Sequence, residues 1–117
     1  MKKFSVIIVL LFIAVATYAQ HSLTGTTCTQ RMDGATTSVN LEKAFSISFF
    51  DNAINLKEFS NVSGAKEHWF PVTAIKVVDY NVFSYTVGDG ESFCVYLQGK
   101  KVTKVIHYKD RIIVTYM

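Results

Sequence analysis

The stretch VFSYTVGDGESFCVYL, residues 82–97, decides the fold of this chain. On either side of its central Gly-Asp-Gly, large apolar side chains recur at every second position. Phe83 and Tyr85 share one face of the first segment, and Phe93 and Val95 share one face of the second. A period of two residues is that of a β-strand, and Gly-Asp-Gly is typical of a hairpin turn. The stretch therefore predicts two antiparallel strands joined by a tight turn.

Short segments of the same kind continue on both sides of this hairpin. Residues 44–50, AFSISFF, alternate between large apolar and serine side chains, which favours a half-buried strand. A short helix over residues 40–48 also fits the apolar spacing. We expect about eight strands in all, over residues 22–32, 35–41, 44–50, 53–59, 72–79, 82–87, 101–108 and 111–117, with a further segment through Phe93, Val95 and Leu97.

Turn residues separate these segments. Asp33-Gly34 predicts a tight type I′ hairpin, in which both residues have positive φ. Lys109-Asp110 predicts the last turn of the chain. The polar interval 60–68, SNVSGAKEH, predicts the longest loop.

Sequential strands with short connections predict an all-β fold, a small antiparallel meander of about eight strands. Eight strands could form either a β-sandwich or a small closed barrel, and the alternation alone does not decide between them. Residues 74–78 and 111–117 carry apolar side chains on both faces. Such strands are covered on both sides, which favours a sandwich with a cover or a surface that self-associates.

The first residues have the plan of a secretory signal peptide. Lys2 and Lys3 precede an apolar run from residue 6 to 16, and Ala19 offers a cleavage site. The run is too short for a typical membrane-spanning helix, although an uncleaved anchor is the alternative. We therefore expect residues 1–19 to be removed and residues 20–117 to form a single all-β domain. That domain would be exported, secreted or periplasmic, with no stable membrane insertion.

Two cysteines remain after this cleavage, Cys28 and Cys94. An even number in an exported chain predicts one intramolecular disulfide. A loop of that size would stabilise the fold by about 4 kcal/mol on chain-entropy grounds. The alternative is two separate thiols, one or both of them buried.

The charge of the predicted domain is nearly balanced. Without Lys2 and Lys3 the chain has ten basic and nine acidic side chains, so it has no general attraction for nucleic acid. One basic concentration remains, which we expect on a solvated face or strand edge, with a site for an acidic partner as the alternative. It consists of Lys100, Lys101, Lys104, Lys109 and Arg111.

No catalytic motif, phosphate loop or dinucleotide-binding glycine pattern occurs in the chain. The three histidines, His21, His68 and His107, do not stand at metal-ligand spacing with one another or with a cysteine. We expect His107 to be a surface or edge histidine. The sequence therefore predicts a protein that is not an enzyme and that needs no metal or cofactor.

The most site-like tripeptide is Glu67-His68-Trp69, which combines an acid, a base and an aromatic ring at the end of the predicted loop. Several tyrosines in the second half of the chain suit a ligand or partner surface, and they equally suit packing between strands. The candidate surface residues are Glu67, His68, Trp69, Tyr85, Tyr96 and Tyr108.

These features predict a small exported β-domain that acts as a binding module for a protein, a glycan or a small apolar ligand. The alternative is a structural subunit that self-associates through an exposed strand edge. The sequence Asn61-Val62-Ser63 also matches the glycosylation sequon, which would count only in a eukaryotic source.

Overall fold

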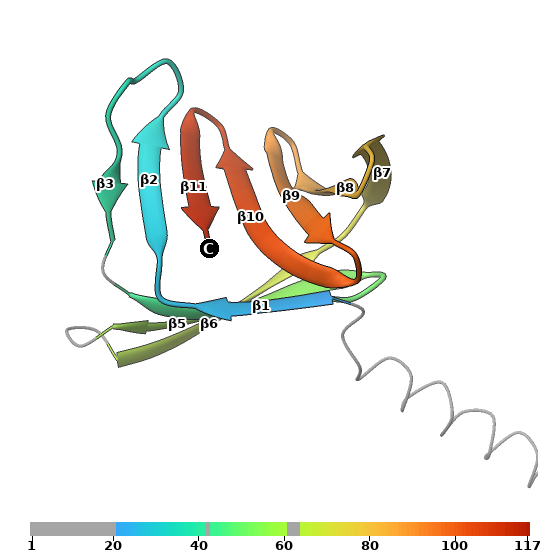
Figure 1. The fold of residues 1–117 in the computed structure, drawn as a ribbon, viewed down its shortest axis with the longest axis horizontal. Helices are drawn as coiled ribbons and strands as arrows, with labels where there is room; N and C mark the ends of the chain where they lie inside the picture. Colours follow the sequence, from blue (N-terminus) through green and yellow to red (C-terminus); the bar gives the residue numbers. More distant parts are fainter. Residues whose placement is uncertain (1–20, 42, 61–63) are drawn as a thin grey trace, which may run out of the picture.

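The computed structural model describes residues 21–41, 43–60 and 64–117. These residues form eleven strands in two antiparallel sheets (Figure 1). The four-stranded sheet has the order β1-β4-β5-β6, and the seven-stranded sheet has the order β3-β2-β11-β10-β9-β8-β7. The strands are β1 His21–Gly25, β2 Cys28–Met32, β3 Val39–Asn40, β4 Ala44–Phe49, β5 Ala53–Ser60, β6 Gly64–Pro71, β7 Ala74–Asp79, β8 Val82–Gly88, β9 Glu91–Gln98, β10 Lys101–Lys109 and β11 Ile112–Tyr116.

The all-β class and the antiparallel pairing are confirmed, but the closed barrel and the count of eight strands are wrong. Within the described residues each sheet has two unpaired edges, so neither closes on itself. The meander also holds only in parts, from β4 to β6 and from β7 to β11. The predicted strand over 22–32 is divided, because β1 pairs with β4 in one sheet while β2 pairs with β11 in the other.

A close backbone approach marks this change of sheet. A Cβ atom on Gly25 would lie 2.6 Å from the carbonyl oxygen of Met117, which is closer than such atoms come. Two residues later, the carbonyl of Thr27 accepts a hydrogen bond from the Met117 N–H at 2.9 Å. The chain therefore crosses between the sheets against its own last residue, and glycine allows the approach.

The structure corrects two local predictions. Residues 44–49 form β4, so the alternative helix over 40–48 is wrong. The predicted loop over 60–68 is also wrong, because Ser60 ends β5 and residues 64–71 form β6, paired with β5 along its whole length. β6 is an edge strand with little burial on either face, so its side chains carry no apolar alternation to reveal it. The sequon at Asn61 and the predicted signal peptide lie outside the described residues.

The predicted turns are present with one change of type. Gly90 and Asp110 adopt positive φ values of 69° and 54° in the β8–β9 and β10–β11 turns. Gly34 has a φ of 85°, but Asp33 does not adopt a positive φ, so this turn is not type I′. The hairpin is also wide, because β2 and β3 pair only at the two positions from Thr29 to Asn40 and from Gln30 to Val39.

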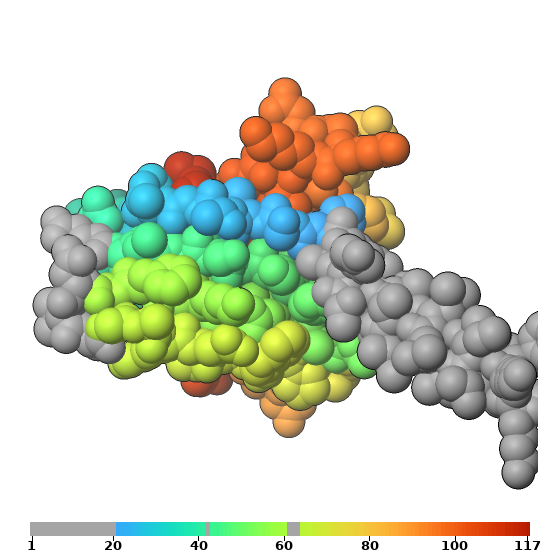
Figure 2. Space-filling view, turned by 90° about the horizontal axis from the view of Figure 1, so that it is seen from below, coloured from blue at the N-terminus to red at the C-terminus, as the bar shows by residue number. Residues whose placement is uncertain are grey.

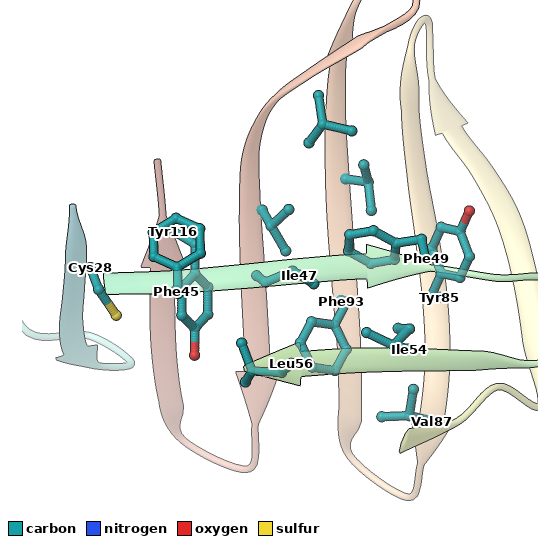
Figure 3. Packing of buried hydrophobic residues seen from close by; sticks show 13 residues of the cluster. Cys28, Phe45, Ile47, Phe49, Ile54, Leu56, Tyr85, Val87, Phe93 and Tyr116 are labelled. Carbon is teal, nitrogen blue, oxygen red and sulfur yellow. The ribbon is translucent and has the colours of Figure 1, made fainter. Parts of the chain in front are cut away.

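The core lies between the two sheets, whose strands cross one another in Figure 3. Phe45, Ile47 and Phe49 of β4 all point toward the seven-stranded sheet, as the alternation in residues 44–50 predicts. Phe45 meets Tyr116 edge-on with ring centroids 4.9 Å apart, and Phe49 lies 5.1 Å from Tyr85. Aromatic side chains from both sheets therefore hold the layers together.

The disulfide prediction is wrong. Cys28 lies on β2 and Cys94 on β9, three strands apart in the seven-stranded sheet, a separation of about 14 Å at 4.8 Å per strand. A disulfide requires Cα atoms within about 7 Å. The register also places the two side chains on opposite faces of the sheet. Across β11 and β10, Cys28 lies in the same row as Val95, and Cys94, the neighbour of Val95 in the chain, therefore points to the other face. Both thiols are free.

Candidate functional site

The tripeptide Glu67-His68-Trp69 is divided between two faces, because neighbouring side chains of β6 point in opposite directions. Glu67 and Trp69 lie on the outer face of the four-stranded sheet, where the indole Nε1–H donates a hydrogen bond to Glu67 Oε1 at 2.8 Å. His68 lies opposite the buried Leu56 and so faces the core side. The structure therefore brings two of the three residues together and separates the third.

The outer face of the four-stranded sheet, which we call the polar face, is seen in Figure 2, where its strands lie side by side. The strand register places two rows of side chains across all four strands. One row is Ser22, Ser48, Asn55 and Trp69, and the next is Thr24, Ser46, Lys57 and Glu67. Trp69 is 59 % exposed. Asn55 is only 5 % exposed, and its Nδ2 has no hydrogen-bond partner.

His68 contributes to a small charged cavity on the other side of this sheet. The cavity has a volume of about 170 Å³. Inside it, Glu58 forms an ion pair with Lys43, and His68 Nε2 lies 3.6 Å from Glu58 Oε1. The lining residues are Lys43, Glu58, Ser60, Gly64, Lys66 and His68. A cavity lined in this way suits a polar ligand rather than an apolar one.

His107 is not the surface histidine that the sequence predicts. It lies opposite Phe93, on the core side of the seven-stranded sheet, and stacks on that ring with centroids 4.0 Å apart and planes 5° from parallel. Its Nε2 lies 2.8 Å from Glu91 Oε2. Burial lowers the pKa of His107, and the neighbouring carboxylate of Glu91 opposes that effect only in part. The β9–β10 hairpin agrees with the predicted meander, but the register shift between Val102 and Lys104 within it has no local signal in the sequence.

The three candidate tyrosines do not form one surface. Tyr85 is buried against Phe49, so its ring packs the core. Tyr96 and Tyr108 share the outer face of the seven-stranded sheet, where Lys104 Nζ lies 4.3 Å from the centroid of the Tyr96 ring. Burial also raises the pKa of Tyr108. Core packing, one of the two readings of the sequence, therefore applies to Tyr85.

Burial raises the pKa of both cysteine thiols. Burial raises the pKa of Cys28 to about 11. The pKa of Cys94 is raised as well, mainly by burial, with an opposing hydrogen bond to Ser84. Both side chains are therefore protonated at neutral pH and are poor nucleophiles.

The predicted basic group is spread along the sheet. Lys100 and Lys101 lie at the β9–β10 turn, whereas Lys109 and Arg111 lie at the β10–β11 turn. The nine residues of β10 separate these two ends, a distance of about 27 Å at 3.4 Å per residue. Lys104 stands between them over the Tyr96 ring. The five side chains therefore do not form a single concentrated site.

Strand β7, the last strand of the seven-stranded sheet (Figure 1), is unusual because its apolar side chains are exposed. All six of its residues are exposed. Val77 is 71 % exposed, Val78 58 %, and Tyr80, in the turn that follows, 87 %. Ile75 is exposed as well. The sequence indicates apolar residues on both faces here and predicts that they are covered on both sides, but within the described residues β7 is an uncovered edge strand.

Among the described residues, no group of three or more His, Cys, Asp or Glu side chains is arranged to hold a metal ion. The same part of the chain contains no helix with the length and apolar character to cross a membrane.

The chain was also compared with known proteins: no protein-family model, no curated protein and no solved structure matches it.

Proposed function

We propose that this protein is a non-catalytic binding module and that β7, with the adjoining Tyr80, is its main contact surface. The observation that carries the proposal is the gathering of exposed Ile75, Val77 and Val78 on an edge strand, with Tyr80 in the turn that follows. Among the described residues this strand has no neighbour on one side.

Natural proteins usually protect such edges with charges, prolines, bulges or a covering segment. Lys76, Asp79 and a register shift are present on β7, but large apolar side chains remain exposed beside them, and exposed apolar side chains that gather in one region mark an interaction site.

The mode of binding follows from the strand. Alternate backbone N–H and C=O groups of an edge strand face away from the sheet, so an extended segment of another chain can pair with them. Ile75 and Val77, which lie opposite Tyr85 and Phe83, then provide apolar contact on the core-side face of the enlarged sheet, and the exposed Val78 adds to the contact beside them. The two packed sheets, which we classify as a β-sandwich with crossed layers, leave this edge open. Export from the cell and removal of residues 1–19 remain part of the proposal.

The partner that the geometry favours is β7 of a second copy. Lys76 lies opposite Ser84, and Asp79 lies opposite Val82. The register shift between Val77 and Asp79 thus puts Lys76 and Asp79 on the same face of the sheet. In an antiparallel pair of β7 strands about a two-fold axis between Val77 and Val78, Lys76 of each copy would lie opposite Asp79 of the other. Such opposite-charge pairs across strands are favourable.

A strand from a different protein is the second candidate, because the same edge and valines would serve it equally. A small apolar ligand has less support, since the cavity beside His68 is lined by charged and polar side chains.

The experiment is sedimentation velocity over a dilution series, with the variant Val77→Lys and the matched control Val39→Lys. Val39 is 64 % exposed and lies on β3, the opposite edge of the same sheet. We expect a concentration-dependent dimer for the wild type and the control, and a monomer for Val77→Lys. A monomer at every concentration for the wild type would rule out self-pairing. A dimer that persists in Val77→Lys would show that β7 is not the contact surface.

A further inference from the structure

We propose that the polar face of the four-stranded sheet binds a linear, neutral oligosaccharide whose pyranose ring stacks on Trp69. This site is on a different sheet from β7, so the inference does not depend on the self-pairing proposed above. A pyranose ring with equatorial hydroxyl groups has an apolar face of axial C–H bonds and a rim of hydrogen-bonding groups. The polar face offers both kinds of partner.

The indole is exposed and also held in place. Its Nε1–H donates to Glu67 Oε1 at 2.8 Å, and the ring of Phe50 lies beside it with centroids 6.0 Å apart and planes at 31°. A ring fixed in this way loses little conformational entropy when a ligand packs on it. More than half of the Trp69 surface remains open, so the aromatic face is available for stacking.

Hydrogen-bonding side chains lie in the same row as the indole. Asn55 is directly opposite Trp69, and Ser48 is directly opposite Asn55. The buried Asn55 amide has an Nδ2 without a partner, and an unsatisfied group of this kind is unfavourable. A ligand hydroxyl can accept that hydrogen bond. Because Asn55 is only 5 % exposed, neighbouring side chains must shift to admit the hydroxyl, and binding therefore changes the surroundings of Trp69.

The face is long enough for more than one sugar ring. Phe59 is a second exposed aromatic residue on this face, four residues along β5 from Asn55. That spacing is about 14 Å at 3.4 Å per residue. Lys57 and Glu67 form the row between them. A flat, extended oligosaccharide would cover the indole, the polar rows and the phenyl ring together, whereas a single sugar would cover only one end.

The test uses cellohexaose as the probe and intrinsic fluorescence as the readout, because the chain contains a single tryptophan. We expect a saturable change in Trp69 emission during a titration to roughly 10 mM, a range in which even a millimolar Kd is measurable. Maltohexaose, whose curved chain does not match a flat face, should bind several-fold more weakly. The absence of any emission change with cellohexaose, or equal affinity for maltohexaose, would overturn the proposal.

Calorimetry of variants then assigns the site. Trp69→Ala should weaken cellohexaose binding about tenfold or more, which corresponds to about 1.4 kcal/mol. Val39→Ala, which removes an exposed apolar side chain from β3 of the other sheet, should leave the affinity unchanged. Far-ultraviolet circular dichroism confirms that each variant keeps its sheets. Wild-type affinity in a folded Trp69→Ala variant would refute the site, even if the protein still bound the sugar elsewhere.

Discussion

Replacement of Phe93 by alanine probes the contact between the two sheets most strongly. Phe93 is fully buried on β9. Its ring lies 5.0 Å from that of Phe70 and 6.4 Å from that of Phe49, both in the four-stranded sheet, and stacks on His107 in its own sheet. Removal of the ring therefore leaves a cavity that touches both layers at once.

The expected destabilisation is about 3–5 kcal/mol, the range for loss of a buried phenylalanine side chain. The total stability of a domain is about 5–15 kcal/mol, so the variant loses a large part of it. At about 4–8 °C per kcal/mol for a domain of up to 100 residues, Tm should fall by about 12–40 °C. Urea denaturation followed by circular dichroism measures the free energy of unfolding directly.

Two further variants keep this test decisive. Phe59→Ala removes the same side chain from the exposed polar face and should change the free energy of unfolding by less than about 1 kcal/mol. Phe93→Leu keeps most of the volume and should cost about 1–1.5 kcal/mol, so it remains measurable if Phe93→Ala does not fold. Equal stability of Phe93→Ala and the wild type would refute the packing of the two sheets through Phe93.

The remaining predictions concern pH, the sheet crossing and the thiols. Burial lowers the pKa of His107 below 6.5 in the folded state, so the unfolded chain binds more protons, and the free energy of unfolding should fall as pH decreases through 6.5 toward the folded pKa. In urea melts at a series of pH values, His107→Gln should make the free energy of unfolding depend less on pH over this range. An unchanged pH dependence in this variant would contradict the prediction. Gly25→Val places side-chain atoms against the Met117 carbonyl and should lower Tm. Thr26 is exposed, so the control Thr26→Val should leave Tm unchanged. Equal melting temperatures for the two variants would contradict the close approach of Gly25 to Met117. Alkylation of the denatured, unreduced protein should label both Cys28 and Cys94, and a mass with no label would restore the disulfide.

Local patterns in the sequence predict individual strands and turns well. The alternation in residues 44–50 and 82–97 identifies Phe45, Phe49 and Phe93 as core residues, and all three are fully buried. The turns at Gly90 and Asp110 are also predictable, because each needs a positive φ that glycine and aspartate tolerate. In these segments the period of the side chains and the local turn chemistry agree.

Features that depend on pairing between distant strands are not predictable in this way. Between Leu23 and Cys28, Gly25 indicates a close backbone approach, but it does not by itself predict a change of sheet, since the crossing depends on the position of Met117. β6 has no apolar period because it stands at an edge. The burial of His107 and the separation of Cys28 from Cys94 both follow from the register of the seven-stranded sheet. For the candidate sites, Trp69 could be singled out, but its partner Asn55 on β5 could not.

Amide hydrogen exchange of β7 at low and high protein concentration tests the central claim most directly, because it observes the proposed contact strand itself. An unpaired edge exchanges rapidly, and pairing with a second copy slows the exchange of the amides that become hydrogen-bonded. The account predicts that residues 74–79 become protected at high concentration, while β3, the opposite edge of the same sheet, does not change. Equal exchange of residues 74–79 at both concentrations, or protection that appears at β3 instead, would contradict it.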